Sequence, residues 1–376
     1  MTASALRGPL PSMDVAGRAD RVRTSLDGSG ADALLVTDLT NVRYLTGFTG
    51  SAGRVLLTSD RMLLVTDGRY ATQAPDQVAT AGVVAEVEVG LTLGEQDRVL
   101  AGAVPPGARL GLEAASVTWA AQRRYGRDPW SSELVPTEDV VEAVRQVKDD
   151  GEVARLARAA RIADAALAEV APTLVDGPTE EAFGFALDTA MRRLGAEGVS
   201  FETIVASGPN GARPHHRPAD RAIGEGDLVV VDFGALVDGY HSDMTRTFQV
   251  GEASATQQRM YEVVAAAQAD GVAAVRAGVA AADVDATCRD AIAAAGWAEA
   301  FGHGTGHGVG LVIHEDPRVS RTSTAMLAPG HVVTVEPGVY LPEHGGVRIE
   351  DTVLVTDDGC RPLTLAPKDP APPTPA

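Results

Sequence analysis

The chain has 376 residues, and its 45% hydrophobic and 22% charged residues are typical of a soluble globular protein whose length favours two domains. Its formal net charge of -19 would repel a nucleic-acid backbone or an anionic membrane surface, so neither is an expected partner. No apolar run approaches the ~18 residues of a membrane span, and the first twenty residues hold no signal-peptide core. We therefore expect a cytoplasmic protein.

The first half of the chain alternates between helical patterns and short apolar runs. A helix is expected around residues 16–26, and strands are expected at 31–38, 53–59, 61–68 and 108–114. Alternation of helices and strands favours an α/β domain, which we place at residues 14–145. Residues 1–13 are expected to be a flexible N-terminus.

A second domain is predicted over residues 148–366, beginning at the charged segment "KDDGE". It opens with a long amphipathic helix that is apolar at positions 153, 156, 160, 163, 167 and 170, and further helices are expected at about 179–194, 255–277 and 283–295. Strands are expected at "DLVVVDFGA", "HSDMTRTFQV", "HVVTVEPGVY" and "GVRIEDTVLV". The Pro-rich tail 367–376 is predicted to be disordered.

All eight histidines lie after residue 214, so we expect the chemistry in the second domain. Three of them fall within "HGTGHGVGLVIHE", at positions 303, 307 and 314. The second and third are seven residues apart with two glycines between them, which does not suit a helical zinc site of the H-E-x-x-H kind. The alternative to a functional histidine cluster is a Gly-rich loop whose histidines have no shared role.

Two aspartates interrupt strands that are otherwise apolar. Asp232 follows "LVVV", Asp243 lies in "HSDMTRTF", and the "DG" at 238–239 is a plausible hairpin turn between them. If Val237 pairs with Tyr240, both carboxylates project from the same face as diagonal neighbours. Because adjacent buried anions repel each other, this pair needs a cation.

Two glutamates repeat the pattern. A symmetric hairpin centred near Glu343 would place Glu336 and Glu350 directly opposite each other. Four carboxylates and a histidine are too many ligands for one small ion, but they suit two divalent metals ~3.5–4 Å apart that share a hydroxide. The alternative is that each acid forms an ordinary salt bridge.

The segments "VVVDFGA", "HSDMTRTF", "HGTGHGVGLVIHE", "TVEPGVY" and "GVRIEDTVLVT" together resemble the signature segments of the pita-bread metallopeptidases, the family of methionine aminopeptidase, Xaa-Pro aminopeptidase and prolidase. The resemblance covers residues from about 148 to 365 and implies an α+β catalytic domain with a curved, largely antiparallel sheet. It implies two divalent metal ions, for which we expect Mn²⁺, with Co²⁺, Zn²⁺ or Fe²⁺ as alternatives. The implied metal ligands are Asp232, Asp243, His307, Glu336 and Glu350.

The resemblance also implies roles for other polar residues. His215 and His314 are expected to be catalytic, with His216 as a fallback for His215, and Glu336 is expected to accept and return a proton. The glycines around His307 would let the backbone turn tightly. Residues that line the pocket or brace the ligands are implied at His303, Tyr340 and Arg348, although Tyr340 and Arg348 could equally be ordinary core or surface side chains.

The N-terminal text "TDLTNVRYLTGFTGSAGRVLLTSD" with "TDGRY" resembles the creatinase-type domain that precedes the catalytic domain in Xaa-Pro aminopeptidases and prolidases. This domain implies a homodimer and a site restricted to short peptides with proline at the second position. On this segment and the compact length we predict an Xaa-Pro aminopeptidase. The alternative is an Xaa-Pro dipeptidase (prolidase), in which Arg318 of "HEDPRV" would bind the substrate carboxylate.

Two further alternatives remain within the same fold. One is creatinase, a hydrolase that uses no metal, and the other is a non-catalytic relative that binds peptides or proteins. The complete ligand set argues against both.

Overall fold

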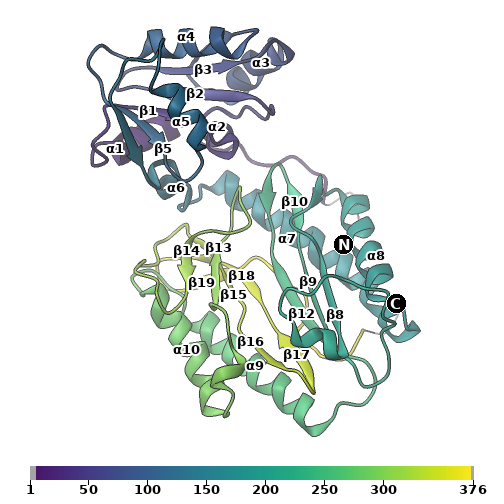
Figure 1. Cartoon of the computed structure of the whole chain (residues 1–376). Coiled ribbons are helices and arrows are strands. Elements are labelled where there is room, and N and C mark those ends of the chain that lie inside the picture. The colour runs from purple at the N-terminus through teal and green to yellow at the C-terminus, as the bar shows by residue number, and fades with distance from the viewer. Residues whose placement is uncertain (1–5, 374–376) are drawn as a thin grey trace. The chain divides into compact units, whose positions relative to one another are not determined.

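The computed structural model describes residues 6–373, which divide into two compact units (Figure 1). The N-terminal unit is Ser12–Arg145, and the C-terminal unit combines the chain up to Pro11 with the chain from Gln146 onward. Among residues 6–373, every helix is too short or too polar to cross a bilayer.

The N-terminus predicted to be flexible over residues 1–13 makes contacts with the C-terminal unit in its described part, and residues 1–5 lie outside the described residues. Leu6 is buried in the core of the C-terminal unit. Arg158 and Arg155 donate hydrogen bonds to the carbonyl oxygens of Gly8 and Pro11. The segment is ordered because its apolar side chain and its carbonyl groups find partners on a distant helix.

The N-terminal unit is built on a mixed sheet with helices around it. Its strands are β1 (Ala33–Val36), β2 (Gly53–Leu57), β3 (Met62–Thr66), β4 (Glu86–Val89), β5 (Leu110–Glu113) and β6 (Leu134–Thr137). Its helices are α1 (Arg18–Leu26), α2 (Leu39–Thr46), α3 (Gln73–Thr80), α4 (Leu93–Ala103), α5 (Trp119–Tyr125) and α6 (Val140–Arg145). The strand order is β4-β3-β2-β1-β5-β6, antiparallel in β3-β2-β1 and parallel outside it, so the α/β prediction is confirmed.

The C-terminal unit has two halves, each with a pair of long helices packed on antiparallel strands. The first half contains α7 (Asp150–Val170), α8 (Glu180–Leu194), β7 (Gly198–Val199), β8 (Ile204–Ser207), β9 (Leu228–Phe233), β10 (Ala235–Val237), β11 (Tyr240–His241) and β12 (Met244–Gln249). The second contains α9 (Ala255–Ala274), α10 (Ala281–Ala294), β13 (Gly306–Gly308), β14 (Glu315–Val319), β15 (Val332–Val335), β16 (Gly338–Leu341), β17 (Gly345–Arg348), β18 (Asp351–Val355) and β19 (Cys360–Pro362). Short 3-10 turns, η2 (Ala171–Asp176), η3 (Gly208–Ala212) and η4 (Ala298–Ala300), connect these elements.

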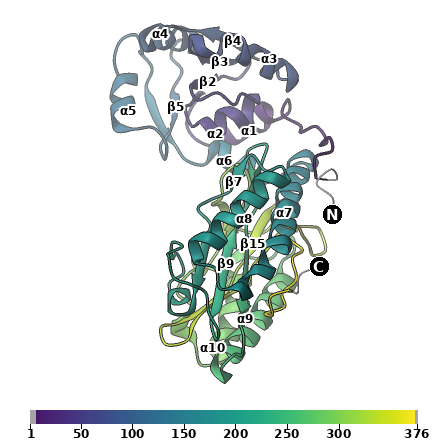
Figure 2. The ribbon, with the colours of Figure 1, turned by 90° about the vertical axis from the view of Figure 1, so that its right-hand side faces the viewer.

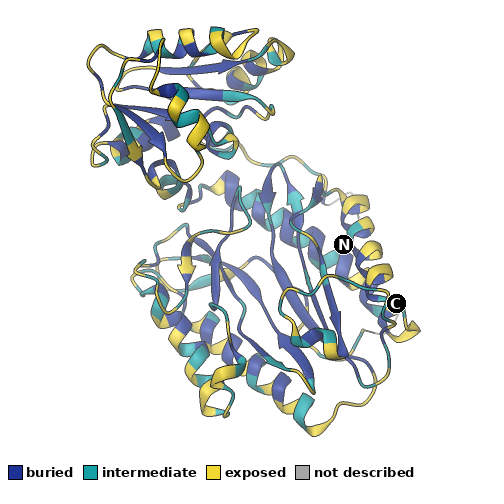
Figure 3. Cartoon of the chain, in the orientation of Figure 1, coloured by how far each residue is buried: buried dark blue, intermediate teal, exposed yellow. Residues whose placement is uncertain are grey.

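Each half buries its own apolar core between helices and strands. Figure 2 shows α7 and α8 side by side in front of the strands, and these helices share one core with β8, β9 and β12. The helices α9 and α10 pack against each other and share the other core with strands β15 to β18. The strands are therefore buried while the outer faces of the helices are exposed (Figure 3).

Both predicted hairpins have the predicted register. Val237 pairs with Tyr240 between β10 and β11, and in the same register Thr245 lies opposite Asp232 between β12 and β9. In the second hairpin the turn centres on Glu343, because Leu341 pairs with Gly345. This register, continued from the β16–β17 ladder to the β15–β18 ladder, is the one in which Glu336 faces Glu350.

The tail predicted to be disordered from residue 367 makes hydrogen bonds as far as Pro370, while residues 374–376 lie outside the described residues. The carbonyl oxygen of Lys368 accepts a hydrogen bond from the Tyr261 hydroxyl at 2.7 Å, and that of Pro370 accepts one from the backbone N–H of Gln249 at 2.7 Å. The Pro-rich composition removes N–H donors but leaves carbonyl acceptors, which other elements use here.

Candidate metal centre

Four acidic side chains meet where the two halves of the C-terminal unit face each other. Asp232 lies near the end of the apolar strand β9, and Asp243 directly precedes β12. Glu336 directly follows β15, and Glu350 directly precedes β18. Asp232, Asp243 and Glu350 each offer a carboxylate oxygen, and these oxygens lie within 4.8 Å of one another.

His307 joins this cluster from β13. Its Nε2 lies 3.3 Å from Oε1 of Glu336 and 3.5 Å from Oδ2 of Asp243. Its Nδ1 lies 3.0 Å from the carbonyl oxygen of Gly308, and a hydrogen bond donated there leaves Nε2 free to bind a cation. The structure therefore brings together all five residues that the sequence suggested as ligands.

The cluster fits a divalent metal centre better than a set of salt bridges. Oδ1 of Asp232 and Oε1 of Glu350 are buried and have no hydrogen-bond partner among the described residues. Burial, followed by the neighbouring carboxylates, raises the pKa of Asp243 and of Glu350 well above the ordinary values. Buried, mutually repelling carboxylates with unused oxygens are stabilised by a cation that those oxygens can bind.

Glu336 differs from the other acids in its proton affinity. Burial alone would raise its pKa, but the His307 ring, when it carries a proton on Nε2, and then His303 and Arg348 bring that pKa to about 2. Thr334 supports this pair, because its hydroxyl donates to Glu336 at 3.3 Å and accepts from the backbone N–H of His307 at 3.0 Å. Glu336 is thus an anion at neutral pH, and a cation bound at Nε2 of His307 would take the place of that proton.

Two of the glycines beside His307 serve close strand packing. None of the glycines at 304, 306, 308 and 310 has a positive φ. A Cβ on Gly306 would lie 2.0 Å from the carbonyl oxygen of Thr334, and one on Gly308 would lie 2.3 Å from that of Asp316. Glycine is needed at both positions because neighbouring backbones approach β13 more closely than any side chain allows.

Arg348 connects one metal-ligand candidate to the pocket. It is buried on β17, and its guanidinium donates to Oδ2 of Asp232 at 2.6 Å and to the hydroxyl of Tyr340 at 2.8 Å. The same hydroxyl lies 2.9 Å from Nε2 of His303. A hydrogen-bonded chain of Asp232, Arg348, Tyr340 and His303 therefore runs along one side of the site.

A cavity of about 650 Å³ opens onto the cluster and is lined by Asp232, Asp243 and Glu336, together with His215, His314 and Arg318. The His314 ring lies 4.4 Å from the ring of His307, centroid to centroid. Burial, and then the charges of His307 and Arg318, lower the pKa of His314 to about 4, so its imidazole is neutral at neutral pH. Apolar side chains supply another part of the wall, namely Phe201, Ile204, Pro214 and Ile313.

The neighbouring histidines His215 and His216 are distinguished by their partners. Nε2 of His216 lies 2.9 Å from the carboxylate of Glu180, the first residue of α8. The same carboxylate accepts from the backbone N–H and hydroxyl of Ser207 at 2.7 Å each, from Asn210 at 3.0 Å and from the backbone N–H of Ala219 at 3.1 Å. His216 is thus engaged in holding the loop, which leaves His215 as the better candidate for contact with substrate.

The sequence reasoning missed Thr245 and Glu180. The Thr245 hydroxyl donates to Oε2 of Glu350 at 2.9 Å and accepts from Arg348 at 3.1 Å. Its position two residues after Asp243 would have placed it on the same face of the strand. Glu180 gives no such signal, because its partners lie 27 to 39 residues away in the sequence.

Comparisons with known proteins agree with this geometry. The sequence matches metallopeptidase family M24 over residues 154–357 and the creatinase/prolidase N-terminal domain over residues 18–147. The uncharacterized peptidase YqhT of Bacillus subtilis is 43% identical over an alignment that covers 93% of this chain and 98% of that protein.

Solved structures match over almost the whole chain. The Xaa-Pro dipeptidase from Bacillus anthracis has a TM-score of 0.89 and 39% identity, with 94% of this chain and 98% of that chain covered. The X-Pro aminopeptidase from Thermotoga maritima has a TM-score of 0.82 and 33% identity, with 92% and 99% covered. The expected fold, a creatinase-type domain followed by a pita-bread domain, is confirmed, and the chain belongs to metallopeptidase family M24, within the group of prolidases and Xaa-Pro aminopeptidases.

Proposed function

We propose that this protein hydrolyses the bond before proline in Xaa-Pro dipeptides, as a prolidase that uses two divalent metal ions. The observation that carries the proposal is that three acids of the cluster, Asp232, Asp243 and Glu336, line one cavity of about 650 Å³ together with Arg318. Among the described residues no hydrogen bond or ion pair engages the Arg318 side chain, so it is available to a ligand. A guanidinium binds a carboxylate bidentately, and the free carboxylate of a C-terminal proline is the group that a dipeptidase must recognise.

The proposed ligands for the ions are Asp232, Asp243, His307, Glu336 and Glu350. Two bound ions would supply a water of lowered pKa and positive charge beside the scissile carbonyl oxygen. We expect Mn²⁺, because carboxylates dominate the donor set, but Co²⁺, Zn²⁺ and Fe²⁺ accept the same donors.

The protein's own side chains supply proton transfer and orientation. Glu336 would accept the proton of the attacking water, then return it to the proline nitrogen as that nitrogen leaves. The imide nitrogen before cleavage carries no proton, so its departure depends on this delivery. His314, a neutral imidazole, and His215 would donate hydrogen bonds to the carbonyl oxygen as it gains negative charge.

An Xaa-Pro aminopeptidase, which the sequence analysis preferred, is the second candidate. Two observations favour it: the Thermotoga maritima X-Pro aminopeptidase matches 92% of this chain, and Arg318 is an exposed residue of the cavity wall. In that case Arg318 would contact a backbone carbonyl group of the substrate instead of its terminal carboxylate.

The two candidates are separated by comparing hydrolysis of Gly-Pro, Gly-Pro-Gly and Gly-Pro-amide by the Mn²⁺-loaded protein. We expect Gly-Pro to be cleaved with the highest kcat/KM. Arg318→Ala should raise KM for Gly-Pro by about 10- to 100-fold, because it removes a charge-assisted pair of hydrogen bonds, and should leave the amide unaffected. Arg321→Ala, which removes an exposed arginine three residues away, is the matched control.

Preferential cleavage of Gly-Pro-Gly, or an equal effect of Arg318→Ala on the dipeptide and its amide, would instead support the aminopeptidase. The homodimer and the cytoplasmic location stay predictions. Light scattering of the purified protein checks the first, and cell fractionation checks the second.

A further inference from the structure

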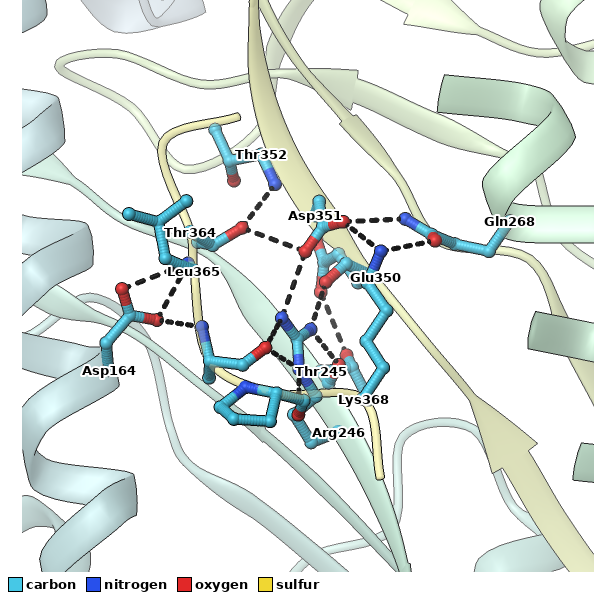
Figure 4. A network of polar contacts seen from close by, with 12 residues as sticks. Asp164, Thr245, Arg246, Gln268, Glu350, Asp351, Thr352, Thr364, Leu365 and Lys368 are labelled. Carbon is cyan, nitrogen blue, oxygen red and sulfur yellow. Dashed lines mark hydrogen bonds and ion pairs between the residues drawn. The ribbon is translucent and has the colours of Figure 1, made fainter. Parts of the chain in front are cut away.

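The segment after the last strand, Leu363–Pro370, lies across the C-terminal unit, and we call it the C-terminal strap. Figure 4 shows its contacts with Asp164, Arg246 and Asp351, next to Glu350. The carboxylate of Asp164 on α7 accepts from the backbone N–H groups of Leu365 at 3.0 Å and Ala366 at 2.8 Å. The strap is therefore fixed to a helix by two hydrogen bonds to a charged group.

Arg246 connects the strap to one metal-ligand candidate. The residue is only 1% exposed, and its guanidinium donates to the carbonyl oxygens of Ala366 at 2.7 Å and Pro367 at 3.2 Å on the strap side. On the other side it donates to the backbone carbonyl oxygens of Glu350 and Thr245. Because a guanidinium is planar and rigid, the position of the Glu350 backbone depends on where the strap lies.

Asp351 forms a second connection beside the same ligand. Its Oδ1 accepts from Arg246 at 3.0 Å and from the Thr364 hydroxyl of the strap at 3.2 Å. Its Oδ2 accepts from Gln268 at 3.1 Å and forms an ion pair with Lys368 of the strap. Every carboxylate oxygen of Asp351 thus has a partner, and two of these partners belong to the strap.

A third connection reaches a different ligand. The backbone N–H of Thr352 donates to the Thr364 hydroxyl at 3.1 Å, and the Thr352 hydroxyl donates to the backbone carbonyl oxygen of Asp243 at 2.8 Å. The strap therefore reaches both Asp243 and Glu350, two of the three acids whose oxygens lie within 4.8 Å of one another.

We infer that the C-terminal strap is a positioning element of the metal centre, which holds Asp243 and Glu350 in place against their mutual repulsion. Buried like charges separate unless their backbones are held, and a ligand set held in position binds a metal without first being ordered. Groups that orient metal ligands from behind typically contribute about 10- to 100-fold in metal affinity. The inference rests on the metal centre and does not depend on which peptide is cleaved.

Lys368 offers a mild way to disturb the strap. The chain has only two lysines, and the other, Lys148, is 1% exposed at its side chain and paired with Glu315. The Lys368 side chain is 36% exposed, so replacing it leaves the apolar core intact. Lys368→Met removes the charge with little change in length, whereas Lys368→Arg keeps the charge.

The test measures Mn²⁺ binding without peptide, by calorimetry and by the spin-resonance signal of free Mn²⁺, together with the melting temperature of the metal-free protein. We expect Lys368→Met and Thr364→Val to weaken Mn²⁺ binding by about 10-fold each, and Lys368→Arg to restore it. Arg361→Met, which removes an exposed cation from β19, is the matched control and should bind Mn²⁺ as the unaltered protein does.

Acetylation of the protein should reproduce the effect of Lys368→Met, whereas reductive methylation, which keeps the charge, should not. Unchanged Mn²⁺ affinity in Lys368→Met and Thr364→Val would overturn the inference, even if their melting temperatures fell, since the strap would then serve stability alone. If the unaltered protein binds Mn²⁺ but cleaves no Xaa-Pro peptide, the proposed function fails and the inference about the strap stands.

Discussion

Replacing Glu180 with glutamine should disable the loop that carries His215. Glu180 is fully buried, and its two oxygens accept hydrogen bonds from Ser207, Asn210, His216 and Ala219. A glutamine keeps one oxygen and presents an amide N–H₂ group to donors on the other side. At least two hydrogen bonds to a charged group are lost, which at about 1.5–3 kcal/mol each destabilises the loop by about 3–6 kcal/mol.

The loss of kcat in Glu180→Gln has an upper bound, because Glu180 affects the reaction only through the loop that carries His215. Removing one donor to a developing oxyanion costs about 10²- to 10³-fold in kcat, so Glu180→Gln should lower kcat by no more than His215→Ala does. The assay compares kcat and KM for Gly-Pro in Glu180→Gln, in His215→Ala and in the double variant. Because both changes remove the same contribution, the double variant should be no slower than His215→Ala.

The matched control is Glu181→Gln, which removes the adjacent but exposed acidic residue and should leave kcat unchanged. Mn²⁺ affinity should be equal in all variants, since Glu180 touches none of the proposed ligands. Two results would refute the reasoning: a Glu180→Gln variant with unaltered kcat, or losses that multiply fully in the double variant.

Three further predictions concern the metal and the pH dependence of stability. Glu350→Gln should abolish Gly-Pro hydrolysis and reduce the number of bound Mn²⁺ ions per chain measured by atomic absorption; an unchanged ion count would remove Glu350 from the ligand set. Chelator should lower the melting temperature and added Mn²⁺ should raise it, because the buried carboxylates repel each other without a cation. At a hundredfold excess of Mn²⁺ over Kd, binding should add about 2.7 kcal/mol to the free energy of unfolding. Equal melting curves would contradict a metal centre. Burial, and then the charge of Lys148, lower the pKa of His331 to about 4 from its ordinary 6.5. Between these two pH values the unfolded chain binds a proton that the folded protein does not. The free energy of unfolding is therefore highest above pH 6.5 and decreases as the pH falls towards 4. That loss amounts to about 3 kcal/mol, and His331→Gln should flatten the slope of urea stability against pH in this range; an unchanged slope would show that another group causes it.

Local patterns in the sequence were enough to predict the hairpins and the four acidic candidate ligands, whereas His307 was indicated by the family resemblance. The side-chain period of a strand is two residues, so a turn at residues 238–239 fixes the face of Asp232 and Asp243 through the pairing of Val237 with Tyr240. The same symmetry, centred on Glu343, aligns Glu336 with Glu350. The period-3.6 pattern likewise predicted α7, which is buried on one face.

Features that depend on contacts between distant segments could not be read from any local pattern. Leu6 and the tail at Lys368 look like free termini in the sequence, yet one packs against helices and the other forms an ion pair with Asp351. His215 and His216 are neighbours with identical side chains, and only the position of Glu180 distinguishes them.

The sequence by itself therefore determined which residues could hold metal ions and on which strand faces they lie, because strand geometry converts spacing into direction. Only the tertiary structure decided what holds those residues in place. Glu350 and Asp243 are positioned from behind by Arg246 and Thr352, whose hydrogen bonds join segments more than 100 residues apart, and no short-range periodicity records such pairings.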